Sequence, residues 1–192
     1  MRVRLVEHLE HYLGEIQDGW KPRDAELSTP FQVVRCRGAF ERSVAFSTLG
    51  LSTHVLSSRV SLKRLCCELF VMVRDSGEWI PRLLDQIGSE ICRSGLAPLR
   101  GDVIGPRGRI ADQYGMTSFY VSIPVWLPEE FACCELPNGE QALFVWLIPI
   151  YNCEAEFIEQ WGWQRFEDEL ERHDPDLLDM QREAIVEPPA AS

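Results

Sequence analysis

The stretch ALFVWLIPI (Ala142–Ile150) determines the expected fold, and its first seven residues form the longest apolar run in the chain. A run of this length is far too short to cross a bilayer. Apolar side chains occupy both alternating faces of the run, as they do in a strand that is covered by other layers on both sides. The sequence therefore predicts a central strand in the middle of a sheet.

Further strands and helices are predicted before this run. Stretches rich in β-formers and bounded by turn residues predict strands at Phe31–Arg37, Ser43–Leu49, Leu65–Val73 and Ser118–Pro124. Helical spacing of apolar residues predicts a first helix at about Val3–Ile16. It predicts a second helix through Ile80, Leu83, Leu84, Ile87 and Ile91, with Pro81 in its first turn and Gly95 after its end. Residues 19–30 and 96–115 are rich in polar residues, Gly or Pro, which predicts loops.

Three short helical pieces are predicted at the C-terminal end. Phe157 and Trp161 belong to the first piece, Phe166 and Leu170 to the second, and these four side chains are expected to form the buried side of the region. A third piece is expected to begin with an N-cap at Asp174, followed by a proline. The tryptophans at positions 79, 126, 146, 161 and 163 are expected to pack in the core, whereas Trp20 is expected to be exposed.

Length and composition favour one ordinary globular domain. The chain has 192 residues, of which 45% are hydrophobic and 26% charged. A chain of this size buries roughly 70% of its surface on folding, so its core needs no metal or disulfide. We expect a single compact α+β domain over residues 1–187, with a mixed β-sheet flanked by helices, and a frayed tail at 188–192.

Cysteine usage and the N-terminus point to a cytoplasmic protein without membrane contact. The seven cysteines form no CxxC pair, and charges interrupt the N-terminus every few residues, unlike a signal peptide. The adjacent pairs Cys66-Cys67 and Cys133-Cys134 are interpreted as small hydrophobes, because neighbouring side chains of an extended chain point to opposite faces.

The net charge is −11, and residues 153–187 contribute −9 of it through twelve acidic residues and three arginines. A surface of this sign repels nucleic acid and attracts a basic protein partner, although a solvated helix surface has the same composition. The side chains expected to meet such a partner are Glu167, Asp168, Glu169, Glu171, Asp174, Asp176 and Asp179.

The sequence offers no motif of catalytic, cofactor-binding or metal-binding residues. GxSxG is absent, and residues 101–109 (GDVIGPRGR) lack the Gly-Lys-Ser/Thr of a phosphate loop, so they are interpreted as a turn with exposed arginines. His8 with His11, and Glu169 with His173, have helical spacing but no third ligand, which indicates solvent-exposed pairs. No enzyme is expected; a hydrolase with an unrecognised site is an alternative.

Several segments, in this order and spacing, resemble the suppressor-of-fused domain in its bacterial form over about residues 31–182. They are FSTLGLS (46–52), CCELFVMV (66–73), GDVIGPRGRI (101–110), YVSIPVWLPEEF (120–131) and FVWLIPIYNCEAEFIEQWGWQRFEDELERHDPDLLDMQR (144–182).

The resemblance implies an α+β fold without known catalytic activity. Animal members have a second domain and clamp a transcription-factor peptide between the two halves by strand addition. This chain is too short for that second half, but an exposed sheet edge can still accept a strand. Bacterial members are often considered immunity proteins that bind and block polymorphic toxins. Together with the missing catalytic motifs and the acidic segment, the resemblance leads us to expect a cytoplasmic protein-binding domain that acts as an immunity protein, with the oligomeric state left open.

The alternative is an adaptor that binds regulatory peptides, either along an edge strand or in the groove beside Trp126 and Trp146. The two interpretations differ in the partner: a toxin with a basic surface in the first, and a regulatory protein in the second.

Overall fold

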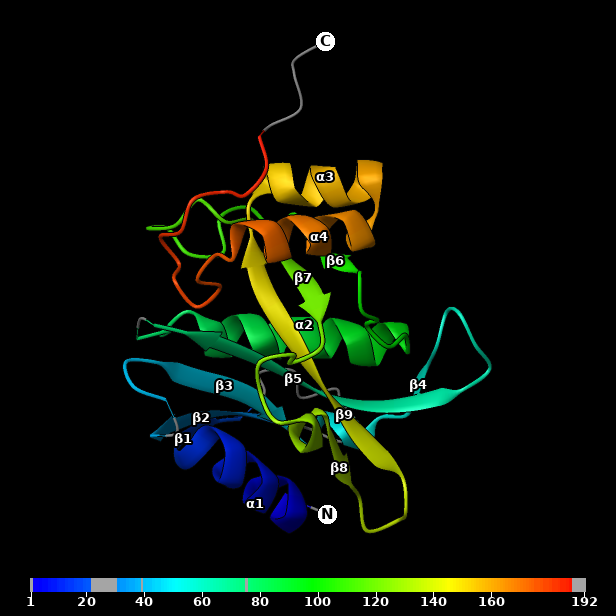
Figure 1. Cartoon of the computed structure of the whole chain (residues 1–192). Helices are drawn as coiled ribbons and strands as arrows, with labels where there is room; N and C mark the ends of the chain where they lie inside the picture. The colour runs from blue at the N-terminus through cyan, green and yellow to red at the C-terminus, as the bar shows by residue number, and fades with distance from the viewer. Residues whose placement is uncertain (1, 22–30, 39, 75, 188–192) are drawn as a thin grey trace.

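Nine strands form one mixed sheet in the computed structural model, which describes residues 2–21, 31–38, 40–74 and 76–187. The strand order is β1-β2-β3-β5-β9-β7-β6, with β4 on β5 and β8 on β9 (Figure 1). The strands are β1 (Gly14–Trp20), β2 (Gln32–Gly38), β3 (Val44–Leu49), β4 (Leu56–Ser57), β5 (Arg64–Val73), β6 (Val103–Ile104), β7 (Ser118–Ser122), β8 (Cys133–Glu135) and β9 (Gln141–Ile150). The helices are α1 (Arg2–Leu13), α2 (Ile80–Ser94), α3 (Asn152–Trp161) and α4 (Trp163–His173), and short 3-10 turns lie at Leu51–Thr53 and Glu129–Ala132.

The predicted central strand is confirmed as β9. It runs parallel to β5, with Phe70 opposite Trp146, and antiparallel to β7 and β8. Its side chains alternate between two apolar layers: Phe144 and Trp146 belong to one buried cluster, and Leu147 belongs to the other. The expected α+β class with a mixed sheet is therefore correct, as are the four strands predicted before β9.

Helices cover both faces of the sheet. α1, α3 and α4 contribute to the cluster on one face, through Leu9, Ile158 and Phe166 among others, whereas α2 packs Leu84 and Ile87 into the cluster on the other face. Pro81 lies in the first turn of α2 and Gly95 caps its end, as predicted. Within the described ranges, no helix combines the length and apolarity needed to span a membrane.

A buried carboxylate fastens β5 to the turn that follows β3. Glu68 is fully buried and accepts hydrogen bonds from the Thr48 hydroxyl (2.6 Å), the Ser52 hydroxyl (2.7 Å) and the backbone N–H of Gly50 (2.9 Å). Burial raises the pKa of the Glu68 carboxyl, and these donors act in the opposite direction. The segment FSTLGLS (46–52) is thus held in its shape by a residue on the neighbouring strand of the sheet.

The first helix is shorter than predicted, and a strand follows it. Gly14 adopts a left-handed backbone (φ 91°) and α1 ends before it. Residues up to Trp20 then pair antiparallel with β2, Ile16 lying opposite Cys36. The prediction of a helix to Ile16 and of a loop from Gly19 is wrong here because β1 is a largely exposed edge strand with few apolar residues. The rest of that expected loop, residues 22–30, lies outside the described residues.

The third predicted helix at the C-terminal end is absent from the described residues. Asp174 adopts a left-handed conformation (φ 43°) and its N–H donates to the carbonyl of Leu170, so it ends α4 instead of starting a helix. Phe166 is buried as expected, but 51% of Trp161 is exposed, with Arg165 over its ring. The expected frayed tail, residues 188–192, lies outside the described residues.

The tryptophans divide between core and surface. Trp146 is buried, and Trp79 and Trp163 are partly buried, as expected. Trp126 is as exposed as Trp20 (37% and 38%), so its expected place in the core is wrong. It lies at an edge-on angle to Trp146, with ring centroids 5.7 Å apart.

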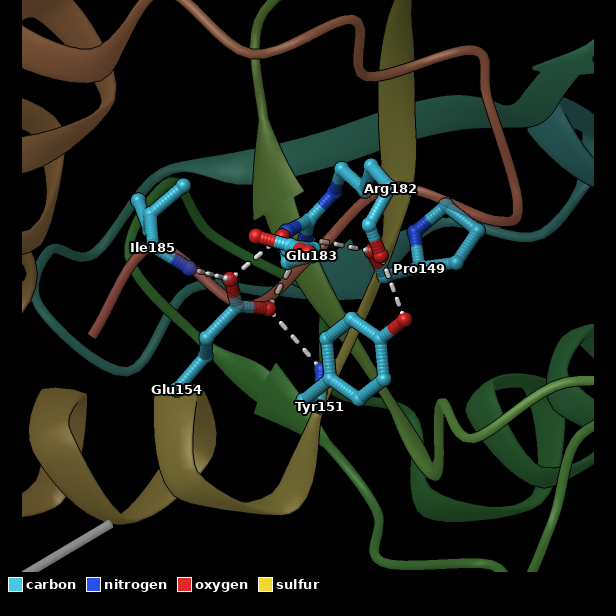
Figure 2. A network of polar contacts seen from close by, with 6 residues as sticks. All are labelled: Pro149, Tyr151, Glu154, Arg182, Glu183 and Ile185. Carbon is cyan, nitrogen blue, oxygen red and sulfur yellow. Dashed lines mark hydrogen bonds and ion pairs between the residues drawn. The ribbon is translucent and has the colours of Figure 1, made fainter. Parts of the chain in front are cut away.

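The segment after α4 is fastened to the start of α3 by a buried ion pair (Figure 2). The Arg182 guanidinium donates to both carboxylate oxygens of Glu154 at 2.7 and 2.8 Å, and also to the carbonyl of Pro149. Glu154 accepts further bonds from the backbone N–H groups of Tyr151 and Ile185, while the Tyr151 hydroxyl donates to the Arg182 carbonyl. Figure 2 shows these groups converging around the Glu154 carboxylate, which is fully buried.

We predict that Arg182→Met lowers the free energy of unfolding by about 3–5 kcal/mol, because it leaves the buried Glu154 carboxylate without its charged partner. Arg172→Met is the matched control, since Arg172 pairs with Glu169 but its side chain is 68% exposed. That control should cost less than about 1 kcal/mol. Urea unfolding of both variants measures the two values, and equal costs would contradict a stabilising role for the buried pair.

Candidate functional site

The sheet ends at β6, which pairs with β7 and with no other strand of the described chain. The carbonyl of Asp102 accepts the N–H of Val121 at 2.9 Å, and Ile104 lies opposite Phe119. In an antiparallel ladder, alternate residues point their backbone groups to the neighbouring strand, so those of Val103 point away from β7. An edge of this kind can template the pairing of another strand.

Two glycines allow β6 to lie close to its surroundings. Gly101 and Gly105 both have positive φ angles, of 97° and 142°. A Cβ atom on Gly101 would lie 2.5 Å from the ring of Trp163, and one on Gly105 would lie 2.5 Å from the Ser118 hydroxyl. The segment GDVIG therefore fits this edge only with glycine at both ends.

A hollow of about 350 Å³ lies between β6 and α2, and we call it the α2 hollow. Apolar side chains contribute much of its lining, among them Ile87, Ile91, Leu96 and Ile104. The charged residues that line it form pairs, Arg59 with Asp102 and Arg107 with Glu90. The hydrogen bond from Arg107 lowers the pKa of Glu90. Arg107 was expected to be an exposed arginine of a turn, and that expectation is wrong because the ion pair holds it against α2.

A second hollow, of about 600 Å³, lies between β6 and α3, and we call it the α3 hollow. Ala155 and Ile158 contribute its apolar part, and Glu156 and Glu159 contribute carboxylates, as does Asp102, which is paired with Arg59. Glu156 accepts a hydrogen bond from Asn152 at 2.6 Å, whereas the Glu159 side chain has no polar partner in the described part of the chain. No lysine, arginine or histidine is among the residues that line this hollow.

The two hollows lie on opposite faces of the sheet edge. α2 belongs to the cluster on one face and α3 to the cluster on the other. Figure 1 accordingly shows β6 between α3 and α2. A strand added beside β6 would therefore have one hollow on each of its faces.

Glu167 fixes the loop that leads into β6. Its carboxylate accepts two hydrogen bonds from Arg100, at 2.9 and 2.6 Å, and one from the Tyr120 hydroxyl at 2.7 Å. Arg100 also lies over the ring of Trp163 at 5.1 Å. Burial, followed by the bond to Glu167, raises the pKa of Tyr120. Glu167 was expected to meet a partner, but its carboxylate instead connects α4 to the loop before β6.

The other six acidic residues expected to meet a partner fall into two groups. Glu169 accepts bonds from Arg172, Asp176 pairs with Arg74, and Asp179 accepts the backbone N–H of Gln181. The remaining three side chains are exposed and have no polar partner among the described residues, and we call them the α4 carboxylates: Asp168, Glu171 and Asp174.

Several residues that could act as nucleophiles or metal ligands are instead packed in the protein interior. All seven cysteines are free, and burial raises the pKa of Cys36 to about 12 and that of Cys66 to about 11. His8 is half-buried, stacks on Phe144 at 4.9 Å and places its Nε2 3.0 Å from the carbonyl of Phe131, so it is not the solvent-exposed residue expected. Within the described ranges, no three His, Cys, Asp or Glu side chains are grouped to hold a metal.

Sequence reasoning missed β6 because residues 96–115 contain four glycines and two prolines and were interpreted as loop. The available signal was the pair Val103-Ile104 between two glycines. A groove beside Trp126 and Trp146 was also expected. In the structure Trp146 is buried, so of these two side chains only Trp126 is available to a peptide.

Comparison with known proteins identifies the same fold elsewhere. A putative suppressor-of-fused homologue from Neisseria gonorrhoeae matches with a TM-score of 0.77 at 17% identity, over 97% of each chain. A structure of a Sufu–Fu complex matches with a TM-score of 0.72 at 13% identity, over 96% of this chain and 91% of that one. Suppressor of fused from Drosophila matches with a TM-score of 0.71 at 14% identity, over 95% of this chain but only 50% of the fly protein. No curated protein matches the sequence.

The family model described as Suppressor of fused protein (SUFU) matches residues 28–183, close to the 31–182 that the motifs indicated. Since that match covers well over half of the chain, this chain belongs to the suppressor-of-fused family.

Proposed function

We propose that this chain is a non-catalytic protein-binding domain that accepts an extended segment of its partner as an additional strand on β6. The observation that supports this proposal is the open edge of β6 with a hollow on each of its faces. Backbone hydrogen bonds to Val103 would supply affinity, and the two hollows would select the alternate side chains of the added strand.

The comparisons support a binding role in general terms. One of the matched structures is a complex of Sufu with Fu, so a protein with this fold binds another protein. At 13% identity that match concerns the fold, and the identity of the partner is not transferred with it. The partner of this chain must therefore be identified from the chemistry of its own surface.

The finer role that we propose is that of a cytoplasmic immunity protein, which blocks a toxin with a basic surface. The α4 carboxylates favour the immunity role, because three exposed carboxylates in and directly after α4 would attract a basic surface. A regulatory adaptor would need only the β6 edge and its hollows. The two roles share the strand site and differ in whether α4 also takes part.

We predict that Val103→Pro weakens the binding of peptides selected against the wild-type chain from a random library by about tenfold or more. Proline removes the N–H that points outward from the edge strand and fixes φ at this position. The lost hydrogen bond and the changed backbone together account for a roughly tenfold loss of affinity. Val103→Ala is the matched control, since it keeps the N–H, and should change Kd by less than about threefold.

Fluorescence polarisation gives the three dissociation constants, and circular dichroism with urea unfolding shows that both variants remain folded. If the proline variant binds the selected peptides as tightly as the wild type does, or if no peptide can be selected at all, strand addition at β6 is wrong.

We predict that Asp168→Lys combined with Glu171→Lys and Asp174→Asn slows association with a toxin encoded beside this gene by about tenfold at low salt and flattens its salt dependence. Asparagine is chosen at Asp174 because it tolerates the left-handed backbone found there. The control combines Glu78→Lys, Glu129→Lys and Glu130→Gln, which change net charge equally at exposed positions elsewhere.

Stopped-flow association kinetics measure both combinations. Equal slowing by the control would mean that net charge acts without a defined surface, and unchanged kinetics in both would exclude α4 from the interface. If the toxin encoded beside this gene does not bind the wild-type chain, the immunity role is contradicted and the adaptor role remains.

A further inference from the structure

We infer that the segment bound on β6 is an amphipathic cationic strand, with apolar side chains toward α2 and lysine or arginine side chains toward α3. This inference rests on the proposed strand site and specifies its partner. It comes from the different chemistry of the two hollows.

The α2 hollow favours an uncharged apolar side chain. Its charged residues already form pairs, Arg59 with Asp102 and Arg107 with Glu90, so it offers no net charge to an incoming ion. Asp102 is further occupied by the backbone N–H of Leu99, at 2.7 Å. A charged side chain placed here would lose hydration without gaining a partner, whereas an aliphatic one would bury apolar surface against α2.

The α3 hollow favours a cation on an aliphatic stem. Glu156 and Glu159 both line it, and its lining includes no basic residue to neutralise them. Glu156 holds a neutral partner, Asn152, and Glu159 has no polar partner within the described residues. Ala155 and Ile158 provide an apolar surface along which the methylene groups of lysine or arginine can lie while the charged end reaches the two carboxylates.

The geometry of a strand turns these two preferences into a sequence pattern. Successive side chains of a strand point to opposite faces, and the hollows lie on opposite faces of β6. Residues that alternate between apolar and basic therefore satisfy both hollows at once. A segment with the same composition in blocks would place charges against α2 and apolar groups beside the carboxylates.

Three synthetic octapeptides test the inference: alternating Val-Lys, alternating Val-Glu, and four valines followed by four lysines. Fluorescence polarisation at 0.15 M salt should show the alternating Val-Lys peptide binding about 3- to 30-fold more tightly than either of the others, as two partly exposed ion pairs allow. The block peptide has the same charge, so it controls for unspecific attraction to an acidic protein.

Two further variants assign the preference to the α3 hollow. Glu156→Gln with Glu159→Gln should bring the alternating Val-Lys and Val-Glu peptides to within about twofold of each other, because the ion pairs are lost. Glu129→Gln with Glu130→Gln removes the same charge at exposed positions away from α3 and should leave the preference intact. A preference that survives Glu156→Gln with Glu159→Gln overturns the assignment.

The outcomes separate this inference from the function on which it rests. If both alternating peptides bind equally and Val103→Pro weakens both, strand addition holds and the charge preference is wrong. If the block peptide binds as tightly as the alternating one, the two-sided recognition is wrong. If none of the three peptides binds, but peptides selected from a library bind and need the Val103 N–H, the inference about the partner is wrong and strand addition holds. If no peptide of any kind binds, both the inference and the proposed strand addition are wrong.

Discussion

The parallel pairing of β5 with β9 positions the other elements of this fold. Parallel neighbours need a long crossover, and here the chain between them supplies α2, β6, β7 and β8 before β9 returns to the middle of the sheet. Because β9 is covered on both faces, α2 must pack on one side and α1, α3 and α4 on the other. The same arrangement leaves β6 at the end of the sheet, between α2 and α3. The candidate binding edge is thus a consequence of the topology.

Polar contacts fix the positions of the helices α2, α3 and α4 around β6. Glu154 and Arg182 fix the start of α3, Glu167 fastens α4 to the loop before β6, and Glu90 holds Arg107 against α2. In each case an acidic residue forms an ion pair within the protein, so part of the acidity of this family member is structural. Glu159 on α3 and the α4 carboxylates remain without a polar partner in the described part of the chain, and of these Glu159 lines the α3 hollow beside the proposed site.

The sequence predicted the elements whose pattern is strong and missed those that depend on distant contacts. β9 was predicted because it contains the longest apolar run, and α2 because its apolar residues follow a helical period, with Pro81 and Gly95 marking its ends. β1 was missed because an exposed edge strand shows few apolar residues, and β6 because a strand of two residues has no period. Glu167 could not be distinguished from Asp168 by sequence, since its partner Arg100 lies 67 positions away. The family was recognised from ordered motifs, whereas the site became visible only when α2, α3 and β6 were brought together.

The central claim is that a partner strand pairs with β6, and hydrogen–deuterium exchange of the backbone amides tests it most directly. With a bound peptide, the account predicts slower exchange at residues 101–105, most strongly at Val103, because its N–H gains a partner on the open side of the sheet. Protection confined to β1 or α4, with exchange at Val103 unchanged, would contradict the account.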